Sequence, residues 1–304
     1  MPLVEVLGAP ELLEFRRPPE LEDFFVLSPF AMCSRGRYEM LLRLVNRDED
    51  PSNKISRIHH ATSVDGVRFD VGGEVIAPGT ADEPDGAGCE DPTVARAGDA
   101  LTAFYSGYNA RRQRSTMLAS TGGSLQGLHK TGAVLPADDA YANAKEAALI
   151  STSRGIRMFF EYARDGASRI GVADALQLSG PWTYGDSPMA ARSDAFDSWH
   201  LSPCSAIRRD DGTHVLFYNG ASKQTAWRVN YALLDETATV VLDRPKPPLV
   251  TPFGLEDGDT DIAFAASALV DSTGSVWLYY SIADRKPYRC RLRVAGATRD
   301  SATR

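Results

Sequence analysis

Residues that build metal and redox sites are scarce in this sequence. Four cysteines are spread over 304 residues without a Cys-x-x-Cys pair, at Cys33, Cys89, Cys204 and Cys290. Five histidines are present, and the adjacent His59 and His60 would point to opposite faces of a strand, so they cannot bind one metal ion together. We therefore expect reduced, buried cysteines, no metal and no cofactor.

Basic charge and long apolar runs are also lacking. The formal net charge is −7, which argues against a nucleic-acid partner because phosphate binding needs a concentrated Lys/Arg surface. No apolar run reaches the length of a membrane span, and the first 15 residues carry Glu5, Glu11 and Glu14 where a secretory signal would be basic and then apolar. These features predict a cytoplasmic protein without a membrane partner and leave a homo-oligomer open.

Helical periodicity is almost absent, and one pattern of β-strands recurs instead. Each copy has a short first strand, then an apolar run rich in β-branched and aromatic residues, then a third alternating segment. Turn dipeptides such as Asp65-Gly66 and Asp211-Gly212 separate the strands. The copies begin at Phe24, Cys89, Lys145, Leu201 and Ile262.

The repeat predicts an all-β, five-bladed β-propeller in which sheets surround a central channel. We expect one domain spanning 1–304, and the predicted blades are approximately 24–69, 89–130, 145–182, 200–243 and 262–294. The alternative is two β-sandwiches in tandem, which would not require five similar openings.

The first strand of each blade lines the channel, so equivalent positions on these strands should meet in one cavity. Aligning the openings of the copies groups Ser28, Asp91, Glu146, Ser202 and Ala265. A single acid at a strand start is usually a turn or capping residue. Two acids at corresponding points of neighbouring blades instead predict a shared pocket.

A second alignment, at the ends of the middle runs, groups Arg43, Tyr105, Glu161, Asn219 and Ser281. The charges of Arg43 and Glu161 interrupt apolar strands, which a core tolerates only if the groups are paired or reach water. A plain salt bridge between them is one interpretation, and a polar ligand the size of a sugar between them is the other.

These acids suit the cleavage of a glycosidic bond. Inversion needs one carboxyl group as acid and another as base, on opposite faces of the sugar. Asp91, Glu146 and Glu161 are the candidates. Some aromatic residues are either core residues or stacking surfaces for the sugar: Tyr105, Trp199, Tyr218 and Tyr280.

Four strings, in order, resemble the five-bladed family of β-mannoside phosphorylases and β-mannosidases. They are SRIHHATSVDGVRF from Ser56, GCEDP from Gly88, AKEAALI from Ala144 and YYSIAD ending at Asp284. The resemblance covers roughly residues 24 to 294, and GCEDP is the most specific string.

The resemblance implies that Asp91 is the general acid and that Asp284 contacts the sugar whose bond is broken. It places Arg43, Arg57 and Lys145 at family-like substrate-binding positions, and we add Tyr105 and Asn219 to that set. However, Glu161 stands where a phosphorylase would have Arg, and Asn219 where it would have His. Thr93 replaces the usual Arg after Glu-Asp-Pro, and the first blade opens with Ser28-Pro29 instead of Asn-Pro.

A carboxylate at position 161 would repel phosphate and could activate water, so hydrolysis is favoured over phosphorolysis. The sequence predicts a hydrolase for a short β-linked mannoside or a related oligosaccharide. The alternatives are a phosphorylase of the same family and a sugar-binding propeller that has lost turnover. As a general acid, Asp91 should have a raised pKa because it is recessed beside Glu90 and Glu146.

Overall fold

The computed structural model describes residues 2–298 apart from 35, 51–52, 137 and 225. Over these residues the protein is all-β, without an α-helix, and none of its helices could cross a membrane. Short 3-10 helices occupy three connections: η1 Pro19–Leu21, η3 Leu125–Gly127 and η4 Asp139–Tyr141. The predicted fold class, all-β, is confirmed.

Three described sheets have four antiparallel strands each. Two of them use consecutive strands, and in the third the N-terminal β1 pairs with the C-terminal β21 and so joins the two ends of the chain. Their strands are β11 Lys145–Thr152, β12 Gly155–Arg164, β13 Ala167–Ala175 and β14 Thr183–Gly185; β15 His200–Arg208, β16 His214–Ala221, β17 Arg228–Leu234 and β18 Val241–Asp243; and β1 Val4–Leu12, β19 Ala263–Val270, β20 Val276–Ile282 and β21 Lys286–Val294.

The remaining described strands form one nine-stranded sheet. A single parallel pair, Ser56 with Gly88, joins its two halves, β3–β6 and β7–β10. The short β2 extends the first half by pairing with β6 in parallel. The strands are β2 Glu14–Arg16, β3 Phe25–Ser34, β4 Arg37–Val45, β5 Ser56–Ser63, β6 Arg68–Ile76, β7 Gly88–Ala97, β8 Ala100–Asn109, β9 Arg114–Gly122 and β10 His129–Ala133.

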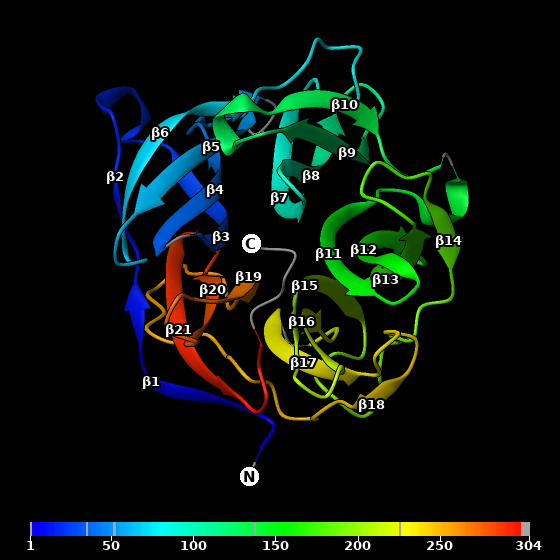
Figure 1. Ribbon diagram of the computed structural model, residues 1–304. Coiled ribbons are helices and arrows are strands. Elements are labelled where there is room, and N and C mark those ends of the chain that lie inside the picture. Colours follow the sequence, from blue (N-terminus) through cyan, green and yellow to red (C-terminus); the bar gives the residue numbers. More distant parts are fainter. Residues whose placement is uncertain (1, 35, 51–52, 137, 225, 299–304) are drawn as a thin grey trace.

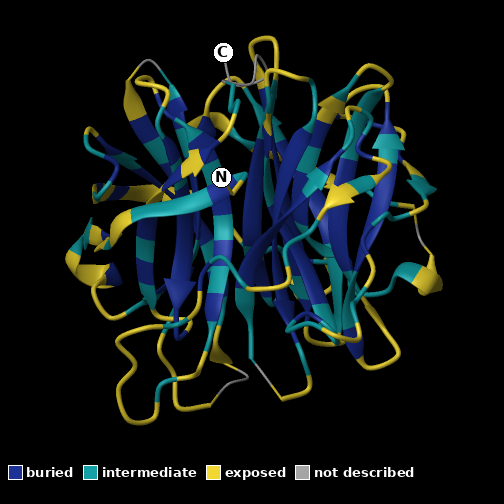
Figure 2. Cartoon of the chain, turned by 90° about the horizontal axis from the view of Figure 1, so that it is seen from below, coloured by how far each residue is buried: buried dark blue, intermediate teal, exposed yellow. Residues whose placement is uncertain are grey.

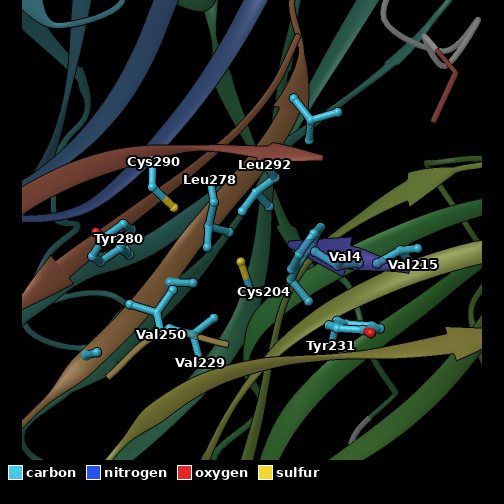
Figure 3. Packing of buried hydrophobic residues seen from close by; sticks show 14 of the residues in the cluster. Val4, Cys204, Val215, Val229, Tyr231, Val250, Leu278, Tyr280, Cys290 and Leu292 are labelled. Carbon is cyan, nitrogen blue, oxygen red and sulfur yellow. The ribbon is translucent and has the colours of Figure 1, made fainter. Parts of the chain in front are cut away.

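The sheets follow one another around a centre, with β3, β7, β11, β15 and β19 innermost (Figure 1). Buried apolar clusters lie between neighbouring sheets, and Figure 3 shows the one where the β15–β18 sheet meets the sheet of β1 and β19–β21. The strands are largely buried and the loops are exposed (Figure 2). Because apolar residues face the next sheet around the ring, the arrangement differs from two sandwiches in tandem.

Each innermost strand carries a β-bulge near its start, where two of its residues oppose one residue of the next strand. Bulges redirect side chains and are frequent beside active sites. Ser28, Asp91 and Glu146 lie in three of these bulges and have φ angles of 46°, 49° and 52°. Such left-handed conformations are uncommon for residues other than glycine. In β15 the bulge lies between Pro203 and Ser205, so Ser202 is not the equivalent of Asp91 and Glu146.

Candidate active site

A cavity of about 370 Å³ opens at the end of the ring where the innermost strands begin. It brings together six of the nine predicted site residues, from four different sheets or half-sheets: Arg43, Asp91, Lys145, Glu146, Glu161 and Asp284. The other lining residues are Leu27, Ser28, Glu90, Trp227, Phe264, Ala266 and Ser281. Asp91, Glu146 and Glu161 therefore line one cavity, as the sequence predicts.

Arg43, near the end of β4, links the acids of the Glu-Asp-Pro motif. Its guanidinium forms an ion pair with Glu90, and its Nη1 lies 3.5 Å from Asp91 Oδ1. The same Asp91 oxygen accepts a hydrogen bond from Ser28 Oγ at 2.6 Å, and Glu90 accepts one from Ser56 Oγ at 3.3 Å. Burial raises the pKa of Glu90 despite the charge of Arg43. Arg43 therefore interacts with Glu90 and Asp91, not with Glu161.

Asp91 and Glu146 form a buried, hydrogen-bonded carboxyl pair. Burial alone would raise the pKa of Asp91, but Arg43, Lys145 and the hydrogen bonds from Ser28 and Glu146 outweigh it, and the pKa is lowered. Burial and the negative charge of Asp91 raise the pKa of Glu146 well above its ordinary value. Our expectation of a raised pKa at Asp91 is thus wrong, because it ignored these partners. Of these two carboxyl groups, Glu146 is therefore the one that takes up a proton first as pH falls.

Glu161 lies near the end of β12, opposite Lys145 in the register of the sheet. Its Oε1 accepts a hydrogen bond from Ser168 Oγ at 2.7 Å and lies 3.4 Å from Lys145 Nζ. Burial would lower the pKa of Lys145, but Glu161, Asp91 and Glu146 raise it, so the ammonium stays charged. A buried carboxylate with these partners can hold a water molecule by hydrogen bonding and accept its proton.

Asp284 reaches the cavity from the turn between β20 and β21. Ala283 and Asp284 have consecutive φ angles of 55° and 52°, so the turn holds two non-glycine residues in the left-handed region. Burial raises the pKa of Asp284, and the charge of Arg43 lowers it by less. The carboxyl is therefore placed at the cavity wall by a strained turn, where it can hydrogen-bond a sugar hydroxyl.

Three predicted site residues do not line the cavity. Arg57 forms an ion pair with Glu74 at 3.1 Å on the neighbouring strand β6. Tyr105 is buried between sheets, and its hydroxyl donates to Asp85 at 2.9 Å. Its neighbour Ser106 is the residue opposite Glu90, so our alignment was shifted by one residue, which turns a side chain to the other face.

Asn219 is the third residue, and its amide is used within the fold. Its Nδ2 donates to the carbonyl of Ala265 at 3.0 Å, and its Oδ1 accepts from the N–H of Ala265 at 2.7 Å. Both partners lie on β19 of the next sheet. Asn219 therefore joins two sheets, and its side chain is buried away from the cavity.

Among the lining residues that sequence reasoning missed are Glu90, Trp227 and Phe264. Glu90 belongs to the recognised motif, but strand alternation alone would turn it away from Asp91; the bulge brings both to the cavity. Trp227 and Phe264 gave no signal beyond their aromatic character. Tyr218 and Tyr280, which we considered as stacking surfaces, are buried in the apolar clusters. Among the described residues no group of His, Cys, Asp and Glu could hold a metal ion.

A family model described as beta-1,4-mannooligosaccharide phosphorylase, glycoside hydrolase family 130, matches residues 31–286. The chain belongs to this family. A search of curated proteins found no match. Membership confirms the resemblance seen in the sequence and makes the chain a member of a family of glycoside-processing enzymes that contains mannoside phosphorylases and hydrolases.

Solved structures agree with this fold at low sequence identity. The β-1,2-mannobiose phosphorylase from Listeria innocua has a TM-score of 0.75 and 19% identity, over 96% of this chain and 95% of that chain. A glycosyl hydrolase from Bacteroides ovatus has a TM-score of 0.75 and 19% identity, over 97% and 99%. A third structure has the same TM-score and identity, over 99% of both chains. It is reported under the statement that the GH130 family of mannoside phosphorylases contains glycoside hydrolases that target β-1,2 mannosidic linkages in Candida mannan.

Proposed function

We propose that the protein is a glycoside hydrolase that cleaves a short β-linked mannoside, or a related oligosaccharide, with inversion. Asp91, Glu146 and Glu161 are the proposed catalytic residues. Arg43, Lys145 and Asp284 are the proposed substrate-binding residues. A related solved structure carries the statement that the family contains hydrolases for β-1,2 mannosidic linkages, which supports hydrolysis as an activity available to this fold.

The charge of the cavity is the observation that favours water over phosphate as the nucleophile. Five carboxyl groups and two cations are among its described lining residues. Both cations are engaged, Arg43 with Glu90 and Asp91, and Lys145 with Glu161. A phosphate dianion would therefore meet surplus negative charge without a free cation from the lining, whereas a neutral sugar and water would not.

The proposed mechanism uses the shared proton of the buried pair. Glu146 holds the proton, and the Asp91–Glu146 pair delivers it to the glycosidic oxygen as that bond breaks. Glu161, held by Ser168 and Lys145, accepts a proton from the water that attacks the anomeric carbon. Arg43 keeps Asp91 charged and so keeps the proton on Glu146.

We also propose that the ring is a five-bladed β-propeller forming one domain over 1–304. The division of the nine-stranded sheet at the Ser56–Gly88 pair supports this count, because each resulting unit has one innermost strand with the same bulge. The proposed blades correspond approximately to 24–69, 89–130, 145–182, 200–243 and 262–294. A cytoplasmic location is proposed from the composition of the chain alone.

Phosphorolysis is the second candidate, favoured by the description of the matching family model. One assay separates the two reactions: β-linked mannobioses are incubated with the protein in phosphate buffer and in phosphate-free buffer, and the products are separated. Hydrolysis predicts free mannose at equal rates in both buffers. Mannose 1-phosphate as the main product would reject our proposal.

A further inference from the structure

The turn between β20 and β21 has a conformation that its own residues disfavour. Ala283 and Asp284 both lie in the left-handed region, with φ angles of 55° and 52°, and neither is glycine. Two such residues in a row persist only where the surrounding structure holds them. The contacts that hold this turn therefore also keep the Asp284 carboxyl at the cavity that it lines.

Contacts to this turn come from the connection between β18 and β19. The N–H of Ala283 donates to the carbonyl of Ile262 at 2.9 Å. Arg285 forms an ion pair with Asp259, and Lys286 Nζ lies 3.5 Å from Asp259 Oδ2. The connection thus holds the backbone at the start of the turn and both cations that follow it.

Asp259 is the buried carboxylate at the centre of these contacts. Its side chain is 0% exposed, whereas those of Arg285 and Lys286 are 45% and 26% exposed. Its N–H donates to the carbonyl of Glu256 at 2.9 Å, and its Oδ2 accepts from the N–H of Glu256 at 3.0 Å. Lys286 also pairs with Glu256 at 2.7 Å. Because a buried carboxylate needs charged or hydrogen-bonding partners, Asp259 and the two cations hold one another in place.

The neighbouring part of the connection has little apolar packing to fix it. Residues 254–258 are all exposed, including Leu255. The position of this segment relative to the turn therefore depends on the ion pairs of Asp259 more than on buried apolar side chains.

We propose that Asp259 is a positioning residue for the reaction. By holding Arg285 and Lys286, it keeps the β20–β21 turn in the conformation that places Asp284 at the cavity wall. Asp259 is not among the lining residues, so it acts through Asp284 and not on the sugar. The assignment rests on the proposed substrate-binding role of Asp284. Without Asp259 the turn relaxes and the carboxyl of Asp284 loses its fixed position relative to the substrate.

A double-mutant cycle tests this role. The loss of β-linked mannobiose is followed in phosphate buffer, so that turnover is counted whichever nucleophile is used. We expect Asp284→Asn to lower kcat/KM about 10- to 100-fold, the usual effect of a hydrogen bond to a charged group. Asp259→Asn should lower it about tenfold, with the same split between kcat and KM, because it displaces the same group. In the Asp284→Asn protein, Asp259→Asn should add less than about a twofold loss.

Further variants separate positioning from a general loss of folding. Arg285→Gln removes the same contact from its other side and should also lower kcat/KM. Asp257→Asn is the matched control, because Asp257 is exposed in the same connection and lies outside these ion pairs, and it should leave kcat/KM unchanged. Amide hydrogen exchange at Ala283 and Arg285 should accelerate in Asp259→Asn but not in Asp257→Asn.

The outcomes distinguish this role from the proposed function. An equal loss from Asp259→Asn with and without the Asp284 carboxyl, or unchanged exchange at the turn, would overturn the positioning role while leaving hydrolysis standing. Mannose 1-phosphate as the main product, together with a cycle in which Asp259→Asn adds no further loss, would support the positioning role and reject hydrolysis.

Discussion

The proton that we propose on Glu146 has a testable consequence for the pH dependence of activity. An acid must be protonated to act, so activity is present below its pKa and lost as pH rises through it. In the native protein this alkaline limb should follow the raised pKa of Glu146. In Glu146→Gln the remaining acid is Asp91, whose pKa is lowered, so the limb should move to lower pH.

The size of the effect follows from the loss of general acid catalysis, which is typically about 10²- to 10⁴-fold. At neutral pH we expect kcat of Glu146→Gln and of Asp91→Asn to fall by this factor on a natural mannobioside. An activated aryl mannoside needs no protonation of its leaving group, so the deficit on it should be much smaller. The fold should survive, because Gln and Asn keep the shape of each side chain.

The assay is a kcat/KM profile against pH for the native protein, Glu146→Gln and Asp91→Asn on both substrates. Glu74→Gln is the matched control, since Glu74 pairs with Arg57 outside the cavity lining, and its profile should equal that of the native protein. An alkaline limb at the same pH in Glu146→Gln as in the native protein would show that Glu146 does not hold the proton. Equal losses on both substrates would refute acid catalysis by the pair.

Two further predictions concern stability, measured by urea unfolding. Asn219→Ala should lower the free energy of unfolding by about 2 to 4 kcal/mol, because it leaves the buried N–H and carbonyl of Ala265 without the two partners described above; a change below 0.5 kcal/mol would contradict this role. Gly220→Ala should lower the free energy of unfolding by about 1 to 3 kcal/mol, because the added Cβ would lie 2.5 Å from Asp197 Cβ. Gly73→Ala is the control: nothing lies within 4 Å of its added Cβ, so its free energy of unfolding should not fall by a comparable amount. Equal effects of the two glycine substitutions would contradict the packing argument.

The sequence predicted the all-β fold class and the meeting of Asp91, Glu146 and Glu161, because both depend on a repeat that survives in the strand pattern. The sequence was less reliable where the placement of a side chain depended on one residue of strand register. The bulge in every innermost strand adds a residue that alternation does not reveal. On the neighbouring strand β8, an alignment shifted by one residue selected Tyr105 in place of Ser106, which lies opposite Glu90.

The sequence pattern also could not identify charged partners that come from other parts of the fold. The pKa of Asp91 depends on Arg43 and Lys145, which are distant in sequence, and its direction could not be inferred from Glu90 and Glu146 alone. Asn219 matched a ligand position in the alignment, yet its amide is satisfied by Ala265 of the next sheet. Conversely, only the structure shows that Trp227 lines the same cavity as the acids.

The most direct test of the account is to follow the reaction by NMR in water enriched in ¹⁸O and containing phosphate. If water is the nucleophile and inversion occurs, the first product from a β-mannobiose is α-mannose with ¹⁸O at the anomeric carbon, and no mannose 1-phosphate forms. Mannose 1-phosphate as the first product, or ¹⁸O-labelled mannose released first as the β-anomer, would contradict the assignment of Glu161 as the base that activates water.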